Sequence, residues 1–156
     1  MIRPTPLAAA FTFALGLSIG APAPVAAQDP ALTYEMAERA ADAAEAEARR
    51  NGWNVTILVA DADGVPVYVK RLTGASPRSF EVAMRKARTA AATGLTTAEY
   101  GQRREAGRIA ELEDGVTFAG GVPILAGGQV IGAIGTSGVR ADDDEVVSRA
   151  GVEAIE

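Results

Sequence analysis

The side chains with the clearest potential for chemistry are basic, and they lie on two neighbouring stretches of the chain. The first stretch carries Arg78, Arg85, Lys86 and Arg88, and the second carries Tyr100, Arg103, Arg104 and Arg108. The chain as a whole is acidic, with a formal net charge of −5 at pH 7. A basic surface in an acidic protein favours capture of a small or flat anionic ligand. Nucleic acid is not expected as a partner, because its phosphates would be repelled by the overall negative charge.

The sequence contains neither histidine nor cysteine. Ser-His-Asp and Cys-His catalysis are therefore excluded, as are zinc and iron–sulfur centres built on those ligands. The glycine-rich stretch lacks the Gly-Lys-Ser/Thr of a phosphate-binding loop. A pair of glycosidase carboxylates is not singled out either. We therefore expect a binding protein rather than an enzyme.

Two acidic groups are candidate cation sites, and each has a simpler explanation. Asp61 and Asp63 flank a turn at Gly64, where aspartate side chains satisfy local backbone N–H groups. A calcium loop would need several more oxygen ligands at fixed spacing. The acidic run 142–145 falls in the first turn of an expected helix, where the helix dipole favours negative charge. We favour the explanations without a metal.

The N-terminal residues have the pattern of a secretory signal peptide. Arg3 precedes an apolar run at 7–19, and small residues follow up to Ala27. This pattern predicts a signal peptide over 1–27, cleaved after Ala27, and a periplasmic or secreted protein with a single domain over 28–156. A retained N-terminal anchor is the alternative. The apolar run is too short for a membrane span, and no later stretch is long enough for one.

The rest of the chain alternates between helical patterns and hairpins. We expect helices at 34–51, 79–93, 98–108 and 143–155, and strands at 55–60, 65–72, 122–126 and 130–134. The turns Asp63-Gly64 and Gly127-Gly128 connect the strands as hairpins. Because no tight βαβ crossover is present, we predict an α+β fold with an antiparallel sheet and helices over it.

The stretch from 118 to 138 is predicted to form a central hairpin of this sheet, since its strands are apolar on both faces. Its glycines would let a helix, a neighbouring chain or a ligand approach the backbone closely. We favour the helix at 79–93 for this role.

Several motifs follow one another in a characteristic order. They are Val59-Ala60-Asp61-x-x-Gly64 with Arg71-Leu72-Thr73-Gly74-Ala75, Ser79 with Ala83-x-x-Lys86-Ala87-x-Thr89-Ala90, Thr96, Gly120-Gly121-Val122-Pro123-Ile124, Ile131-Gly132-Ala133-Ile134-Gly135-x-Ser137-Gly138, and Asp144-Glu145. In this order they resemble the GlcG/HbpS-like haem-binding (haem-degrading) domain, which is also found at the C-terminus of PduO-type proteins. The resemblance covers almost all of 32–156.

The resemblance implies a profilin-like α/β/α sandwich with an antiparallel sheet of about five strands and helices on its faces. It also implies a homo-oligomer, from dimer to octamer, and haem as the cofactor. The functions that the resemblance implies are haem uptake, iron sensing and haem breakdown. One departure is Leu72-Thr73, where the family usually has Met-Asp. The larger departure is the lack of histidine.

Haem iron in this chain would need an unusual ligand. The candidates are Met36, Met84, Tyr34, Tyr68, Tyr100, Lys70 and Lys86, with Thr89 and Thr96 as weak oxygen donors. Tyrosine is an established ligand of haem iron, and arginines would pair with the propionates. We expect ligand binding on the basic side of the helix at 79–93 and on the segment 96–108 beside it, at Arg85, Lys86, Thr89, Thr96, Tyr100 and Arg103. We expect both methionines to fill the core, and Lys86 to hold a loop or an interface rather than iron.

An exported haem- or tetrapyrrole-binding protein, which buffers or delivers its ligand, is the leading hypothesis. A binder of a small carboxylate, anchored by Arg85 and Lys86, is the second. An oligomeric accessory protein without a ligand is the third, with the glycines and alanines serving subunit packing. An enzyme ranks last, because no catalytic constellation is present.

Overall fold

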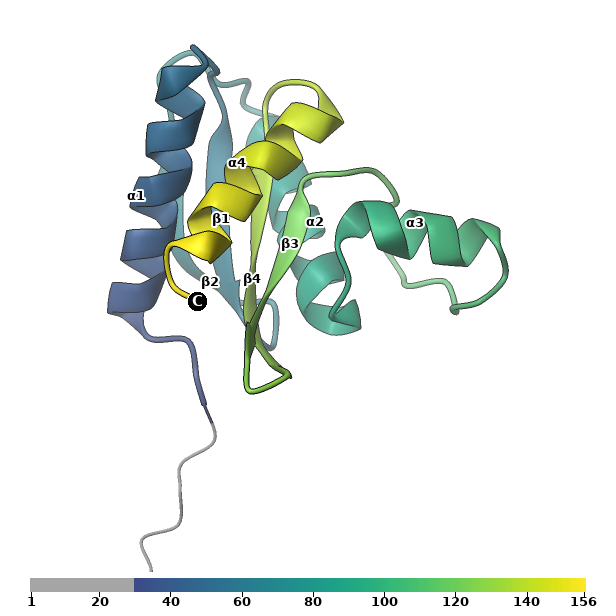
Figure 1. The fold of residues 1–156 in the computed structure, drawn as a ribbon. Coiled ribbons are helices and arrows are strands. Elements are labelled where there is room, and N and C mark those ends of the chain that lie inside the picture. Colours follow the sequence, from purple (N-terminus) through teal and green to yellow (C-terminus); the bar gives the residue numbers. More distant parts are fainter. Residues whose placement is uncertain (1–29) are drawn as a thin grey trace, which may run out of the picture.

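Four antiparallel strands form one sheet at the centre of the protein (Figure 1). They are β1 (Thr56–Asp61), β2 (Pro66–Arg71), β3 (Gly121–Ala126) and β4 (Gln129–Ser137), in the spatial order β2-β1-β4-β3. The structure is a computed structural model, and it describes residues 30–156. The predicted signal peptide, residues 1–27, lies outside the described residues.

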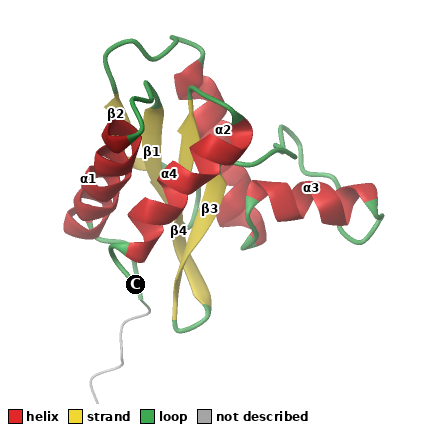
Figure 2. Ribbon diagram, turned by 45° about the horizontal axis from the view of Figure 1, so that its top comes forward, coloured by secondary structure: helices red, strands yellow, loops and turns green. Residues whose placement is uncertain are grey.

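Helices cover both faces of the sheet, so the layers form an α/β/α sandwich (Figures 1 and 2). The helices are α1 (Tyr34–Arg50), α2 (Ser79–Thr93), α3 (Thr97–Glu105) and α4 (Ala141–Glu153). Helices α1 and α4 pack together on one face, α2 packs on the other, and α3 lies beside α2 and β3. The predicted α+β sandwich is confirmed.

The sheet has four strands in the part of the chain that the structure describes, so the expectation of about five is wrong by one. The residues that could have supplied another strand, 106–120, are irregular. Two of their backbone N–H groups, those of Leu112 and Val116, donate to the side chains of Tyr100 and Thr89. A strand would instead donate these groups to a neighbouring strand.

Small side chains let the layers approach closely. Five alanines of α1 are fully buried: Ala37, Ala40, Ala41, Ala44 and Ala48. In β4, a Cβ at Gly135 would lie 2.0 Å from the carbonyl oxygen of Ala83 on α2. The prediction that the hairpin glycines admit a helix is confirmed at this position.

The β1–β2 turn is built by the side chain of Asp61. Its Oδ1 accepts hydrogen bonds from the backbone N–H of Asp63 at 3.0 Å and of Val65 at 2.9 Å. Gly64 adopts φ +74°, as the hairpin turn requires. Asp61 therefore serves the turn, as we expected. In residues 30–156, no helix is long and apolar enough to cross a membrane.

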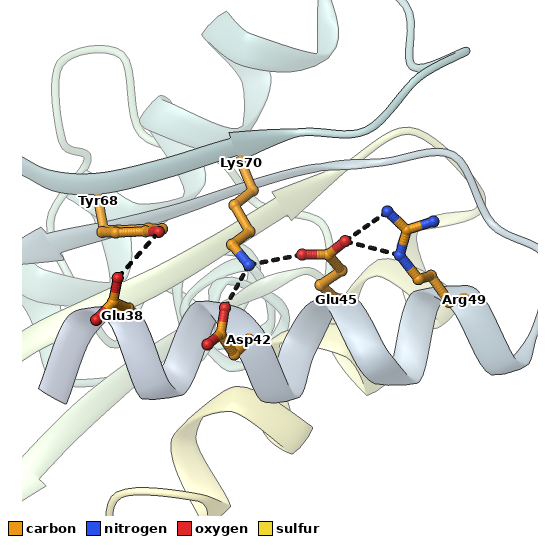
Figure 3. Close-up of polar contacts among 6 residues, drawn as sticks. All are labelled: Glu38, Asp42, Glu45, Arg49, Tyr68 and Lys70. Atoms are coloured by element: carbon orange, nitrogen blue, oxygen red, sulfur yellow. Dashed lines mark hydrogen bonds and ion pairs between the residues drawn. The ribbon is translucent and has the colours of Figure 1, made fainter. Parts of the chain in front are cut away.

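A polar network attaches the edge strand β2 to α1 (Figure 3). Lys70 donates to Glu45 at 2.6 Å and also to Asp42. Glu45 accepts a further bond from Arg49 at 2.7 Å. The Tyr68 hydroxyl lies 3.5 Å from Glu38. These contacts span the two elements, so they fix how the edge of the sheet sits on α1.

Candidate functional site

The most deeply buried charges belong to Lys86 on α2 and Asp144 on α4. Lys86 Nζ donates to Asp144 Oδ2 at 2.8 Å and to the carbonyl oxygen of Thr136 at 2.9 Å. The side chains are 1% and 4% exposed. The ring centroid of Phe118 lies 5.1 Å from Nζ, within the range of a cation–π contact. Lys86 thus joins α2, β4 and α4 in the interior.

Burial acts on both members of this pair. It lowers the pKa of Lys86, while the hydrogen bond and charge of Asp144 oppose that shift. Burial likewise raises the pKa of Asp144, against the stabilising effect of Lys86. Each charge therefore depends on its partner, because an unpaired ion at this depth would be strongly disfavoured.

The pair Gly120-Gly121 makes room for Lys86. A Cβ at Gly120 would lie 2.4 Å from Lys86 Nζ, and one at Gly121 would lie 2.5 Å from the Lys86 carbonyl oxygen. Gly120 also has φ +119°, a conformation that side-chain-bearing residues rarely adopt. These glycines therefore serve the approach of α2 and its lysine.

Three of the predicted site residues hold the segment 106–120 in place. Thr89 Oγ1 accepts a hydrogen bond from Val116 N at 3.0 Å. The Tyr100 hydroxyl accepts one from Leu112 N at 2.8 Å. Arg85 Nε donates to the carbonyl oxygen of Asp114 at 3.1 Å. Helices α2 and α3 therefore determine the conformation of this segment.

A cavity of about 290 Å³ lies between α2 and this segment. Its lining residues are Arg85, Arg88, Thr89, Ala92, Leu112, Glu113 and Asp114, and we name it the Arg85–Arg88 pocket. Arg88 Nε donates to the carbonyl oxygen of Gly64 at 3.3 Å. Within residues 30–156, neither guanidinium forms an ion pair with a carboxylate. Their remaining N–H groups are therefore available to an anionic ligand.

The backbone at the rim of the pocket is unusual at one residue. Asp114 has φ 59° and is the one non-glycine residue with positive φ in the described chain. Aspartate tolerates this region better than most residues. The carbonyl oxygen that Arg85 binds belongs to this residue, so the arginine stabilises the conformation that shapes the pocket.

A larger open groove of about 540 Å³ lies between α3 and the start of α4, and we name it the Phe118 groove. Phe118 is 49% exposed there. Arg104, which lines the groove, is already paired with Glu111. Glu105 and Asp142 also line it, without ion pairs in the described residues. The groove therefore suits an anion less well than the Arg85–Arg88 pocket.

The structure separates the six predicted site residues. Arg85 and Thr89 line the Arg85–Arg88 pocket. Thr96 caps α3 by accepting from Glu99 N at 3.2 Å, and exposed Arg103 pairs with Glu99 at 2.5 Å. Neither lines that pocket. The ligand-binding roles of all six stay predictions.

Sequence reasoning placed Arg88 on the basic helix face, among the arginines available to propionates, but did not include it in the six predicted site residues. Its spacing of three residues from Arg85 puts both side chains on one face of a helix, which was the available signal. The contribution of Leu112, Glu113 and Asp114 had no signal, because they lie on an irregular segment.

The protein is an α/β/α sandwich with a small arginine-lined pocket between α2 and the segment 106–120. The chain belongs to the HbpS-like family: the family model described as "Haem degrading protein HbpS-like" matches residues 32–153. Protein GlcG of Escherichia coli K12 is 35% identical over 108 residues, which cover 68% of this chain and 81% of GlcG.

Solved structures share the fold. A double mutant of Streptomyces reticuli HbpS has a TM-score of 0.76 at 35% identity, covering 88% of this chain and 99% of that chain. A PduOC:heme complex has a TM-score of 0.70 at 27% identity, covering 81% of this chain and 96% of that chain. The GlcG/HbpS-like resemblance read from the motifs is thereby confirmed.

Proposed function

We propose that this protein binds haem or a related tetrapyrrole at the Arg85–Arg88 pocket and buffers or delivers it. Membership of the HbpS-like family and the similarity to a PduOC:heme complex support this ligand class. The observation that carries the proposal is the pair of guanidiniums, Arg85 and Arg88, which lack carboxylate partners in the described chain and line one cavity.

The residues of the pocket fit the edge of the haem that carries the propionates. Arg85 and Arg88 offer paired N–H donors, which match carboxylates in charge and geometry. Ala92 and Leu112 provide an apolar surface for the ring beside them. The cavity lies at the low end of small-molecule sites, roughly 300–1,000 Å³. It would therefore enclose the propionate edge and leave part of the macrocycle exposed.

Haem, when bound, supplies a redox-active iron, and the chain's own residues supply its position. Arg85 and Arg88 would fix the carboxylates. Thr89 would keep the segment 106–120 closed against α2 through its bond to Val116 N. No reaction step is assigned to these groups.

Titration of the mature protein with hemin, followed at the Soret band, tests the proposal. Arg85→Ala and Arg88→Ala should each weaken binding by about tenfold, the value of one charge-assisted hydrogen bond. Arg39→Ala, on the exposed face of α1, is the matched control and should bind as the unmodified protein does. Failure of hemin to give a saturable shift would reject the proposal.

Arg103→Ala separates this site from its neighbour. Arg103 lies on the exposed side of α3, so this variant should retain full affinity. A loss at Arg103 with none at Arg85 would move the ligand to the α3 surface.

A small carboxylate is the second candidate, because a cavity of about 290 Å³ has room for such a ligand. Its anchors would be Arg85 and Arg88, since the ammonium of Lys86 is buried against Asp144. Thermal-shift screening distinguishes the two ligands. Stabilisation by an organic acid, but not by hemin, would favour this candidate.

We further propose that the protein is exported, that cleavage follows Ala27, and that the mature chain forms a homo-oligomer. N-terminal sequencing of the protein from the periplasm or medium should begin at Gln28. Light scattering of the purified mature protein should give a mass at least twice that of the protomer. An exported protein that keeps residues 1–27 would contradict the proposed cleavage. A mass equal to that of one protomer would contradict the proposed homo-oligomer.

A further inference from the structure

The Arg85–Arg88 pocket offers carboxylate recognition but no strong ligand for iron. The chain has no histidine or cysteine, which leaves methionine, tyrosine and lysine as the remaining strong donors. None of the methionine, tyrosine or lysine side chains in residues 30–156 lines the pocket. Each of these side chains makes contacts elsewhere in the fold.

Both lysines are committed to ion pairs. Lys86 Nζ is buried with Asp144 and the Thr136 carbonyl oxygen. Lys70 is held between Asp42 and Glu45 on the α1 side of the sheet (Figure 3). A lysine ligates a metal through an uncharged amine, which requires loss of its proton. The paired carboxylates favour the charged amine, although at Lys86 burial acts in the opposite direction and lowers the pKa.

The tyrosines do not line the pocket either. Tyr100 has no exposed surface, and its hydroxyl accepts from Leu112 N. Tyr68 lies against α1, with its hydroxyl 3.5 Å from Glu38 (Figure 3). Tyr34 is exposed, but its ring centroid lies 5.6 Å from that of Tyr68, so it too belongs to the α1 side. The pocket is on the α2 side.

The described methionines fill the core. Met36 packs against the larger core cluster, and Met84 packs against the cluster that contains Leu58 and Ala83. Around the pocket itself, Thr89 Oγ1 already donates to the Arg85 carbonyl oxygen and accepts from Val116 N. Of the other lining residues, Glu113 and Asp114 carry carboxylates, which suit hard cations and are not among the usual protein ligands of haem iron.

We infer that the Arg85–Arg88 pocket recognises a tetrapyrrole by its carboxylate edge and not by its metal, so that iron-free dicarboxylic porphyrins are ligands equal to haem. This inference rests on the proposed function and specifies it. The guanidiniums determine affinity, and the central metal contributes nothing that the protein detects.

Three probes test the inference on the mature protein: hemin, iron-free protoporphyrin IX, and the dimethyl ester of protoporphyrin IX. Binding is followed by quenching of the single tryptophan, Trp53, or by porphyrin absorbance. Protoporphyrin IX should bind within about threefold of hemin, and the ester should bind at least about tenfold more weakly. Arg85→Ala and Arg88→Ala should weaken hemin and protoporphyrin IX by the same factor, and Arg39→Ala should weaken neither.

Each other result has a defined meaning. Hemin bound at least about tenfold more tightly than protoporphyrin IX would overturn the inference and leave the proposed function standing. An ester that binds as tightly as the free acid would also overturn it. If no porphyrin binds, the proposed function fails and the inference fails with it. Tyr34→Phe and Lys70→Met should leave the Soret spectrum of bound hemin unchanged, and a shift in either would identify an iron ligand.

Discussion

Lys86 Nζ on α2 lies 2.8 Å from Asp144 Oδ2 on α4, although the two residues are 58 positions apart in the sequence. The helices that carry them cover opposite faces of the sheet, and Gly120 leaves the space through which they meet. Val139 N also donates to the second oxygen of Asp144 at 3.2 Å. The pair therefore fixes the start of α4 as well as the position of α2.

Removing one member of this pair should destabilise the fold severely. Lys86→Ala leaves Asp144 as an uncompensated buried charge, so we expect a loss of about 3–5 kcal/mol in the free energy of unfolding. Asp144→Ala should cost a similar amount. The double variant Lys86→Met with Asp144→Leu should recover most of it, because buried pairs are often replaceable by apolar groups. Urea denaturation measures all three.

The same variants settle the ligand-binding role predicted for Lys86. Lys70→Ala, at the edge of the sheet, is the control and should cost about 1 kcal/mol or less. If Lys86→Ala unfolds at the same urea concentration as the unmodified protein but loses hemin, Lys86 would be a ligand contact and our structural assignment would be wrong.

The network of Figure 3 should give the stability a dependence on acid pH. The hydrogen bonds from Lys70 and then Arg49 lower the pKa of Glu45 below its usual 4.5. The stabilisation is therefore present above pH 4.5 and lost as the pH falls through the lowered pKa. We expect about 1 kcal/mol for this part of the acid transition.

Lys70→Met should remove the larger part of that contribution, with Arg49 still bound to Glu45, and make the stability profile below pH 4.5 less steep. The hydrogen bonds to Asp42 and Glu45 raise the pKa of Lys70 above 10.5, against the effect of burial. Its own contribution is therefore present below pH 10.5 and lost as the pH rises through the raised pKa. Identical pH profiles for the variant and the unmodified protein would show that the network adds no stability.

The contact between β4 and α2 should not tolerate a methyl group at Gly135. The new Cβ would overlap the Ala83 carbonyl oxygen and lie 2.6 Å from Ala87 N, and neither backbone atom can move alone. We expect Gly135→Ala to be insoluble or to lose most of its stability. Gly52→Ala is the comparison, since nothing lies within 4 Å. Its left-handed conformation alone should cost about 1–2 kcal/mol. Equal thermal midpoints for the two variants would contradict this.

The elements were predictable because their signals are local. Hairpin turns such as Asp63-Gly64 and the alanine stripe of α1 depend on neighbours within a few residues. The predicted helices and strands accordingly end within about three residues of those observed. The prediction of about five strands came from the resemblance, and the described residues form four. In the segment 106–120, the backbone N–H groups of Leu112 and Val116 donate to side chains instead of to a neighbouring strand.

The site was harder to predict, since its contacts connect distant segments. The acidic run 142–145 was assigned to the helix dipole, and nothing local shows that Asp144 turns inward to meet Lys86. Both residues belong to the family motifs, which was the one available signal. The lining by Leu112 and Asp114 depends on the hydrogen bond that Leu112 N donates to Tyr100 and on the one that Arg85 donates to Asp114. Irregular segments have no periodicity from which to infer such bonds.

Thr89 should control the pocket by holding its outer wall. Thr89→Val keeps the volume but leaves the buried Val116 N–H without its acceptor, which should cost about 1–3 kcal/mol. Amide exchange at Val116 should accelerate, and hemin affinity should fall as the segment loosens. Thr89→Ser retains the hydroxyl and should restore both. A valine variant that binds hemin and exchanges its Val116 amide as the unmodified protein does would show that this hydrogen bond does not hold the wall.

Asp114 should oppose the ligand that Arg85 and Arg88 attract, because it is a negatively charged residue among those that line the same cavity. Asparagine tolerates the left-handed backbone at φ 59° as aspartate does, so Asp114→Asn removes the charge and keeps the conformation. We expect affinity for a dianionic porphyrin to rise by about threefold at low ionic strength. The gain should shrink with added salt, since exposed charges are screened.

Glu105→Gln, in the Phe118 groove, is the matched control and should not change the affinity for the porphyrin. If Glu105→Gln raises the affinity and Asp114→Asn does not, the ligand occupies the Phe118 groove instead.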